Sequence, residues 1–519
     1  MEQYGLDELA ASADAVVAGL GPLAAGLARL AVAAGQAVTL EAMEVLVAGR
    51  GREILRGIVQ LGLDAQADAE VRLPRVMGAD GVVRARAERD HCRAVVTTVG
   101  QVRVRRIAYR PGVKGAGSLF PRDAVLNLPP CGYSWPLQRL AEMFCRSGSY
   151  AQAHEFVLAA TGVSVGKRQL ERITAAAAAD AERFCQDQPR DRAALPVTGK
   201  EDQEDLPPLA LSADGKGVAM RPEARRARTK APGRRAQSFA HRRGTGEKGH
   251  KRMAETGCVF DLQPPDPAGP PRTPEQIMRP QPGSGTNAPA AVNRWYTTDI
   301  TAGREVTIGK IFAEADRRDP GHARTWIALV DGDIHQIGLI QAQAAARGIT
   351  ITILVDLIHV LEYLWKAAWC FHTPRDPAME DWVTQQGLDI LHGRVTAVIT
   401  RIGQLAEDHP PHPGGEHAKI IRKTLHYLHA KQPYLDYPTA LAAGWPIATG
   451  VIEGACRHLV HDRMGITGAR WGLPGAQAIL WLRAIHASGD LDTYWDWHIS
   501  QEHQRNHLSR YQPAYQLAA

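Results

Sequence analysis

A strand–helix–strand pattern near the middle of the chain most constrains its fold. Two short apolar runs, 326–330 and 349–355, flank a stretch with helical spacing, 336–347, and the runs end on Asp331 and Asp356. Such a unit requires a parallel strand pair joined by a right-handed crossover. The two acids are therefore expected at the carboxyl ends of adjacent strands, where open α/β sheets place their sites.

Three more strands are predicted upstream of this unit. The first, 208–213, ends on Asp214, and two others cover 253–262 and 294–300, with a Pro- and Gly-rich excursion between them. A helix is predicted over 308–318. The pattern predicts an α/β core with a mixed sheet, in which Asp214 follows the first strand and Asp331 the fourth.

The 519 residues are too many for one ordinary core and suggest about three domains. Residues 1–80 have helical spacing and predict a small bundle or an oligomerisation segment. Residues 81–190 predict a β-hairpin followed by two helices, and a polar linker over 186–205 marks a boundary. Residues 206–519 are assigned to the α/β domain, with a helical insertion at about 360–445.

The two helices after Ser149 have the outline of a helix-turn-helix. A turn at 161–163 separates them, and Ser164 is expected to cap the second helix. As a DNA-reading motif, the second helix would place four polar side chains in a major groove, namely Lys167, Arg168, Gln169 and Arg172. An ordinary αα-hairpin has the same pattern, and the hairpin over 93–109 is interpreted as structural.

Positive charge is concentrated between Arg221 and Arg252. Twelve Lys and Arg residues face only Glu223 and Glu247 there, although the net charge of the chain is only +6. Such a run attracts phosphate, and the alternative is a solvated loop. The DNA-contact candidates in and beside this run are Lys216, Arg225, Arg226, Arg234, Arg235, Arg242, Arg243, Lys251 and Arg252.

Three acids are candidates for one metal cluster: Asp214, Asp331 and Glu453, which lies on a later helix. Two Mg²⁺ ions about 4 Å apart can stabilise both the attacking and the leaving oxygen of a phosphodiester, and Mg²⁺ prefers carboxylate oxygens. Each acid has a structural alternative. The two Asp-Gly pairs can simply form turns, Asp333 rivals Asp331 as a ligand, and Glu453 can pair with Arg457 one turn later.

Four segments of the chain resemble insertion-sequence transposases of the ISKra-four group, within the Asp-Asp-Glu superfamily. They read LSADGKGV, RRDPGHARTWIALVDGD, LVDLIHVLEYLWKAAWCFH and PIATGVIEGACRHLVHDRMGITGARWGLPGAQAILWLRA, and the likeness covers about Leu206 to Tyr511. The resemblance implies a ribonuclease-H-like catalytic core and a mainly helical amino-terminal DNA-binding region. It also implies that Asp214, Asp331 and Glu453 bind two Mg²⁺ or Mn²⁺ ions.

The same resemblance implies that the chain cuts the ends of its element and joins the freed 3′-hydroxyl to target DNA. Asp356 and His359 resemble an Asp-x-x-His motif of related transposases and are interpreted as positioning residues. Transposases generally act as multimers, so a homo-oligomer is expected by analogy. Two rival functions stay open: a catalytically silent transposase-derived DNA-binding regulator, and a related metal-dependent nuclease that does not join ends.

Arg470 and Trp471 form a further candidate pair. They could contact a phosphate and stack on an unpaired base, or they could be an exposed Arg beside a core Trp.

The seven scattered cysteines include no Cys-x-x-Cys, which argues against a disulfide framework and a zinc ribbon. Cys370 with His372 and Cys456 with His458 offer too few ligands for a zinc site. The apolar stretches are interrupted by polar residues and predict no membrane span, and acids near the start argue against a signal peptide. The chain is therefore expected in the cytoplasm, and the resemblance implies a location at the bacterial nucleoid.

Overall fold

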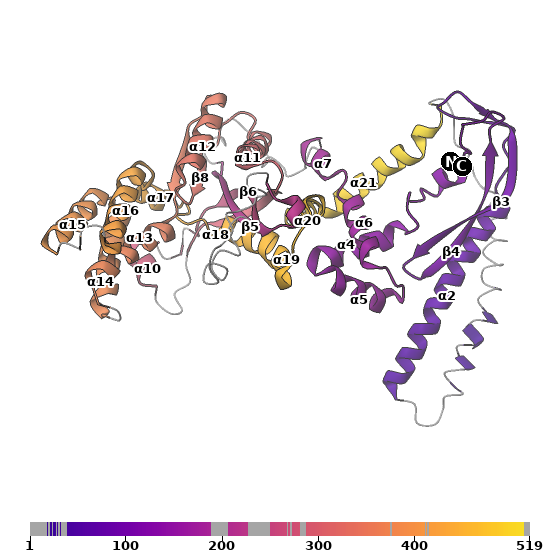
Figure 1. Ribbon diagram of the computed structural model, residues 1–519, viewed down its shortest axis with the longest axis horizontal. Coiled ribbons are helices and arrows are strands. Elements are labelled where there is room, and N and C mark those ends of the chain that lie inside the picture. Colours follow the sequence, from indigo (N-terminus) through magenta and orange to yellow (C-terminus); the bar gives the residue numbers. More distant parts are fainter. Residues whose placement is uncertain are drawn as a thin grey trace, which may run out of the picture. The chain divides into compact units, whose positions relative to one another are not determined.

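The computed structural model describes residues 39–187, 206–226 and 250–512, apart from 267, 270–271, 281–286, 374–375, 410–411 and 413–414, together with single positions between 18 and 32. The chain forms two compact units (Figure 1). Unit 1 contains Met1–Asp187 and Leu491–Ala519, and unit 2 contains residues 188–490.

From Leu40 onward, unit 1 consists first of a long helix that packs on a β-hairpin. The first elements in this stretch are α2 (Leu40–Asp68), β1 (Val76–Met77), β2 (Val83–Arg84), β3 (Arg86–Thr97) and β4 (Gly100–Arg110). β3 and β4 pair in antiparallel fashion, which confirms the predicted hairpin. Arg105 is ion-paired with Asp64 and Asp68 of α2, at 3.1 and 2.8 Å. This arginine therefore joins the hairpin to α2, in agreement with the structural interpretation.

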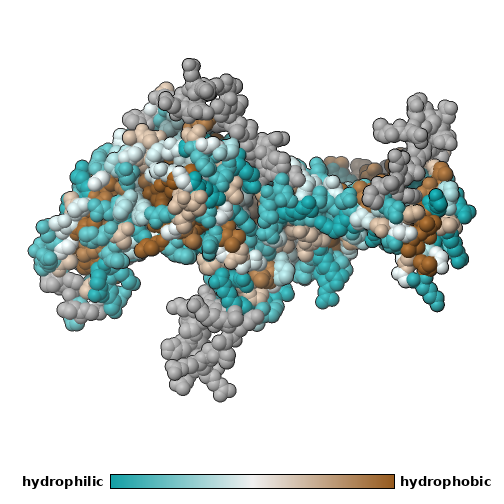
Figure 2. All heavy atoms as spheres, turned by 90° about the horizontal axis from the view of Figure 1, so that it is seen from above, coloured by the Kyte–Doolittle hydropathy of each residue, from teal (hydrophilic) through white to brown (hydrophobic). Residues whose placement is uncertain are grey.

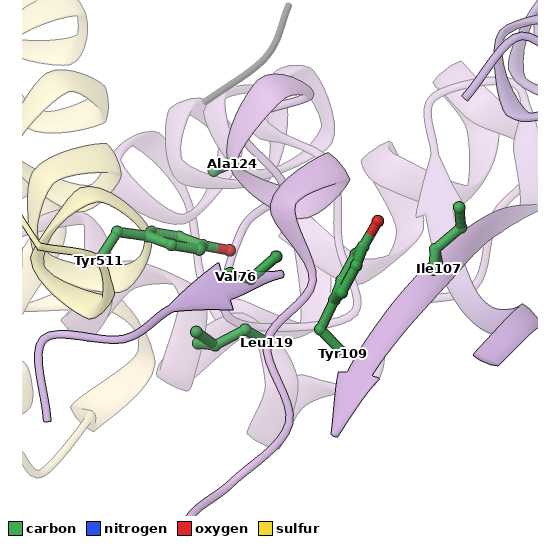
Figure 3. Packing of buried hydrophobic residues seen from close by; sticks show 6 residues of the cluster. All are labelled: Val76, Ile107, Tyr109, Leu119, Ala124 and Tyr511. Carbon is green, nitrogen blue, oxygen red and sulfur yellow. The ribbon is translucent and has the colours of Figure 1, made fainter. Parts of the chain in front are cut away.

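Six helices follow in the described part of unit 1, and the last one comes from the carboxyl-terminal part of the chain. They are α3 (Pro121–Val125), α4 (Trp135–Ser147), α5 (Tyr150–Thr161), α6 (Lys167–Ala177), α7 (Ala181–Asp187), and then α21 (Leu491–Asn506) with the 3-10 turn η6 (Leu508–Arg510). Tyr511 packs beside Val76, Leu119 and Ala124 in one apolar cluster (Figure 3). This cluster ties the last described residues to the β1 and hairpin region.

The assignment of all residues from 206 to 519 to one domain differs from the structure at its carboxyl end. Buried Tyr494 donates a hydrogen bond to the Ala177 carbonyl, and buried His498 contacts Asp180 at 2.8 Å. α21 therefore belongs to unit 1. Its partners lie more than 300 residues earlier in the chain, so no local pattern could reveal them.

The expected pair of helices is present as α5 and α6. Ser149 and Gln152 form a capping box at the start of α5, and Gly162, with φ of 71°, ends it. The expected cap by Ser164 is wrong, because α6 begins after Gly166, which gives no side-chain cap. An extended stretch over 163–166 thus lies between the two helices.

Unit 2 is built on a five-stranded mixed sheet in the order β7-β6-β5-β8-β9. The strands are β5 (Leu209–Ala219), β6 (Lys251–Gln263), β7 (Ala290–Asp299), β8 (Trp326–Val330) and β9 (Ile351–Val355). β8 pairs in parallel with both β5 and β9, whereas β6 is antiparallel to β5 and β7. The predicted parallel pair and the mixed α/β character of this region are confirmed.

The first strand does not end before Asp214 as predicted. β5 continues to Ala219 because its antiparallel pairing with β6 extends from Leu209 to Ala219, far beyond its parallel pairing with β8, which stops at Ser212. Asp214 therefore lies within the strand, just past the point where β5 and β8 separate.

Helices cover the sheet and form the insertion (Figure 1). After β5 and around the sheet come η2 (Pro222–Ala224), α11 (Arg304–Arg318), α12 (Ile334–Arg347) and α13 (Leu357–Phe371), while α10 (Pro274–Met278) packs on the insertion helix α14 (Pro377–Leu391). The insertion continues from α14 with α15 (Val395–Asp408), α16 (Glu416–Lys431), η3 (Gln432–Tyr434) and α17 (Tyr437–Ala442). The chain returns through α18 (Gly450–Ala455), the π-helical segment η4 (Cys456–His461), α19 (Asp462–Met464), η5 (Ile466–Gly468) and α20 (Leu473–Ala487).

The surface carries both apolar and charged residues. Figure 2 shows brown, apolar residues among teal, hydrophilic ones on the surface. Exposed apolar residues include Leu40, Val45 and Leu55 of α2. All seven cysteines are free thiols, in agreement with the sequence analysis. In the described part of the chain, no helix is both long and apolar enough to cross a membrane.

Candidate metal-binding active site

The three candidate acids line one cavity in unit 2. Asp214 comes from β5, Asp331 directly follows β8, and Glu453 lies on α18. The cavity has a volume of about 340 Å³, and its lining is completed by Ala213, Lys216, His359, Thr449, Ile452 and Cys456. Acids that are far apart in the sequence thus meet at one place.

The pairing of β5 with β8 explains why the two aspartates lie at the same level. The last parallel partners are Ser212 and Leu329, and each aspartate follows two residues later on its own strand. The Ser212 hydroxyl donates to the Leu329 carbonyl at 2.7 Å, and Gln336 donates to the Ala213 carbonyl at 2.6 Å. These bonds fix the register at the edge of the sheet where the acids emerge.

The structure separates Asp331 from its rival Asp333. Asp333 caps α12 by accepting from the His335 backbone N–H at 2.9 Å, and its other oxygen is ion-paired with Arg304. Burial raises the pKa of Asp333, but the bonds from Arg304 and the helix start outweigh it, so the pKa is lowered. Asp331 accepts only from the Asp333 backbone N–H, at 2.9 Å, among the hydrogen bonds of the described residues. Asp333 therefore has a structural task, and Asp331 is available to the cavity.

Glu453 does not form the ion pair with Arg457 that was its structural alternative. Within the described ranges, no ion pair joins these two exposed residues, and Glu453 Oε1 instead lies 3.0 Å from the Thr449 hydroxyl, whose single hydrogen is also within reach of Asp356. After Glu453 the helix changes to π-helical hydrogen bonding from Cys456 onward. Short π segments inside helices are frequent at functional sites.

Asp356 and His359 lie beside the acids as a carboxylate–imidazole pair. Asp356 is 1% exposed, caps α13 through the Ile358 N–H at 2.8 Å, and contacts His359 Nδ1 at 3.1 Å. Its second oxygen also accepts from the Thr449 hydroxyl. The bond to Asp356 raises the pKa of His359 above 6.5, while burial of Asp356 is outweighed by its hydrogen bonds, so that its own pKa is lowered. Asp356 therefore orients both the imidazole and Thr449.

The donor set of this cavity fits a hard divalent cation. Ligand atoms of Asp356, His359 and Glu453 lie within 4.8 Å of one another. Asp356 already accepts three hydrogen bonds, and its contact with His359 Nδ1 leaves Nε2 as the ring nitrogen able to bind a metal, as in carboxylate–histidine–metal arrangements. With the oxygens of Asp214, Asp331 and Glu453 on the same cavity, the residues are compatible with a divalent metal ion, and His359 is an added candidate ligand.

Two residues of the insertion contact the turn between Asp331 and Asp333, and the sequence analysis missed them. Gly332 has φ of 95°, and a Cβ there would lie 3.1 Å from the Tyr427 hydroxyl and 3.5 Å from Lys431 Cε. Both polar ends are buried, and neither has a hydrogen-bond partner among the described residues. Burial lowers the pKa of Lys431, and the charges of Asp333 and Asp331 oppose this. The charge of Lys431 was visible in the sequence, but its proximity to Asp331 was not.

Cys456 closes the cavity beside Asp214. Burial, followed by the negative charge of Asp214, raises the pKa of this thiol. The fold itself therefore favours the neutral thiol at this position.

Trp471 lies in the core, as one of its two interpretations predicted. It is 6% exposed, donates through Nε1 to the Met464 carbonyl at 3.1 Å, and has the Arg463 guanidinium 4.7 Å from its ring centroid. Stacking of this ring on a base is therefore not supported. Arg470 is exposed next to it.

The candidate DNA contacts fall into three groups. Lys167, Arg168 and Arg172 are exposed near the start of α6, with Gln169 half-buried. Lys216 lines the cavity, while Arg225, Arg226, Lys251 and Arg252 lie at the two described ends of the basic run. The remaining four, Arg234, Arg235, Arg242 and Arg243, lie outside the described residues.

Among solved structures, the chain matches the Drosophila P element transposase strand transfer complex. The match has 11% sequence identity and a TM-score of 0.21, and it covers 72% of this chain and 81% of that chain. No protein-family model and no curated protein matches the chain. A TM-score this low reflects too little shared geometry to support a function. Membership of the ISKra-four group stays a prediction from the sequence motifs.

Proposed function

We propose that this chain is a transposase that cuts DNA at the ends of a mobile element and joins them to target DNA. One observation carries the proposal: Asp214, Asp331 and Glu453 line the same cavity, and in the described part of the chain none of them has a Lys or Arg ion-pair partner. Carboxylates gathered in this way repel one another unless a cation or a proton neutralises them. Two Mg²⁺ or Mn²⁺ ions are the proposed partners.

The protein side of the reaction follows from the site. Bound divalent cations would stabilise charge on the attacking and leaving oxygens of the phosphodiester. The chain's own task is to hold the ligands: Thr449 orients Glu453, and the turn after β8 packs against α16. Lys216 lines the cavity as a cation that can contact a phosphate oxygen.

The strand order supports this proposal at the level of the fold. A mixed sheet in the order β7-β6-β5-β8-β9, with acids on the central strand and after its parallel neighbour, is compatible with a ribonuclease-H-like core. The helical segment from α14 to α17 then forms an insertion between the second and third acids.

DNA recognition is proposed for two regions. The exposed cations of α6 would read or contact the element ends as part of a helix-turn-helix, and the ends of the basic run would contact phosphates. By analogy with other transposases, the active form is a homo-oligomer at the nucleoid.

The test uses the full chain with DNA that carries the ends of its own element. Wild-type protein is expected to nick this DNA in Mg²⁺ or Mn²⁺, and Asp214→Asn and Glu453→Gln are expected to bind it without cutting. A pre-cleaved end offered with a plasmid is then expected to become covalently joined.

Each alternative outcome has a distinct meaning. Cutting without joining indicates a nuclease, whereas DNA binding without any metal-dependent cutting indicates a regulator. Full cutting by either variant would remove that residue from the site.

A further inference from the structure

Helix α16 of the insertion has a cationic exposed face. Three exposed cations lie along it, Lys419, Arg422 and Lys423, and three exposed histidines lie on the same helix, His417, His426 and His429. Its one acid, Glu416, is 3.9 Å from Lys419 in an exposed pair of the kind that stabilises little. Arg422 and Lys423 have no ion-pair partner within the described ranges. The charge of this face is thus largely unneutralised.

Contacts on the opposite side of α16 show which end of the helix lies near the acids. α16 lies between α13 and α15 (Figure 1). It runs antiparallel to α13: Cys370 contacts the His417 carbonyl near one end, Thr424 donates to the Tyr363 carbonyl at 3.4 Å, and the rings of Tyr363 and Tyr427 stack at 3.9 Å. At its other end, Tyr427 and Lys431 pack on the turn after Asp331.

The cationic face therefore begins near the catalytic acids and leads away from them. A helix rises 1.5 Å per residue, so Lys419 to Lys423 span about 6 Å along the axis, and the exposed basic residues from Lys419 to His429 span about 15 Å. One strand of B-DNA carries a phosphate for every 3.4 Å of duplex axis, so the three cations can face about two phosphates and the whole row about four. A row of this length matches a sugar-phosphate backbone better than it matches a single small anion.

We propose that the exposed face of α16 binds the phosphate backbone of the DNA duplex next to the catalytic cavity. The proposal rests on the proposed function for the identity of its partner, because a duplex whose phosphodiester reacts at the acids must pass over neighbouring surface. It assigns a task to the insertion: Lys419, Arg422 and Lys423 hold the duplex by charge, and His426 can donate a hydrogen bond to a phosphate.

The test measures DNA binding by full-length variants over a range of salt concentrations, in a buffer that contains neither Ca²⁺ nor Mg²⁺. In Arg422→Ala/Lys423→Ala, the slope of log K against log salt is expected to fall in magnitude by about 1.8, because two phosphate contacts are lost. Binding at about 0.1 M salt is expected to weaken at least tenfold. The charge-conserving Arg422→Lys/Lys423→Arg is expected to keep the wild-type slope.

The matched control is Arg279→Ala. Arg279 is also exposed in unit 2, but Asp381 already neutralises it at 2.7 Å, so its loss is expected to leave the slope unchanged. Thermal unfolding of every variant checks that the fold is kept. An unchanged slope in the double alanine variant overturns the proposal. A changed subunit number with an unchanged slope also overturns it, because the face would then contact protein.

This result is independent of catalysis. If wild-type protein binds DNA through α16 but never cuts it, the proposed transposase activity is contradicted and the proposed DNA-binding surface is supported. If wild-type protein cuts and joins DNA while the double alanine variant keeps the wild-type salt slope, the surface fails and the activity stands.

Discussion

The carboxylates of the cavity in unit 2 have different partners from the buried carboxylates of unit 1. In unit 1, buried Asp180 accepts from His498 at 2.8 Å and from Arg505 at 2.5 Å, and buried Glu142 accepts from Arg146 at 2.8 Å. In unit 2, Asp214, Asp331 and Glu453 share a cavity, and no Lys or Arg ion pair reaches them from any described residue.

The difference separates two uses of the same chemical group. A buried carboxylate with a guanidinium partner is neutralised within the fold, and removing one partner leaves a buried charge that costs several kcal/mol. Carboxylates gathered without such partners leave the neutralising charge to be supplied from outside. The first arrangement maintains a fold, and the second suits a metal site.

The largest effect is expected for the two aspartates of the turn that follows β8. Asp331→Asn is expected to lower the single-turnover rate of DNA nicking about a thousandfold, since several kcal/mol of transition-state stabilisation depend on the metals. Asp333→Asn keeps a good helix cap and loses only the pair with Arg304, so a loss below about tenfold is expected. Equal losses of nicking rate in both variants would show that the ion pair with Arg304 does not distinguish the role of Asp333 from that of Asp331.

The next effect concerns stability in unit 1. Asp180→Asn breaks the contacts to His498 and Arg505 and is expected to lower the free energy of opening of α21 by about 3 kcal/mol, measured by amide hydrogen exchange at neutral pH. DNA nicking chemistry at the acids should be spared.

The pH dependence of that loss follows from the lowered pKa of Asp180. Burial raises this pKa, but the bonds from His498 and Arg505 outweigh it, so the folded pKa lies below 3.8. The stabilisation is therefore fully present above 3.8 and is lost as pH falls through the folded value. The gap between wild type and Asp180→Asn should shrink below 3.8; a gap that stays constant contradicts the ionic account.

A smaller effect is expected for the positioning pair in the cavity. Asp356→Asn is expected to lower nicking about 10- to 100-fold, as for other groups that orient metal ligands. Because the bond to Asp356 raises the pKa of His359, that pKa should also fall in the variant, and histidine hydrogen–deuterium exchange can measure it. An unchanged His359 pKa would mean that Asp356 only caps α13.

The smallest effect is expected for Lys431, which lies near the acids of the cavity. Lys431 is a buried cation close to Asp331 but outside ion-pair distance, and its charge opposes that of a bound metal. Lys431→Met is expected to lower the Mg²⁺ concentration needed for half-maximal nicking about three- to tenfold, by removing that repulsion. Lys431→Arg keeps the charge and should keep the wild-type requirement. A raised requirement in Lys431→Met would mean that the lysine supports the site instead.

The sequence predicted those helices and strands whose formation depends on residues close together in the chain. Buried β8 and β9, the helix between them and the acid after each strand follow from apolar runs and their ends, and α5 and α6 follow from helical spacing around a turn. Asp214 was found because it follows an apolar run, although β5 in fact continues past it. That continuation depends on pairing with β6, which lies across the basic run.

The parts that could not be predicted depend on contacts between distant residues. Thr449 bridges Asp356 and Glu453, Lys431 approaches Asp331, and α21 joins Asp180 in unit 1. None of these residues lies in a spacing pattern that distinguishes it from an ordinary helix or loop residue. Trp471 was ambiguous for the same reason, because a tryptophan beside an arginine suits both a core and a base-stacking surface.

The location of bound Mn²⁺ tests the central claim most directly. In crystals of the full chain soaked with Mn²⁺, anomalous scattering is expected to place metal about 2.0–2.3 Å from carboxylate oxygens of Asp214, Asp331 and Glu453. Metal bound only elsewhere in the chain, or no metal in this cavity, would contradict the claim that these three acids form a metal centre.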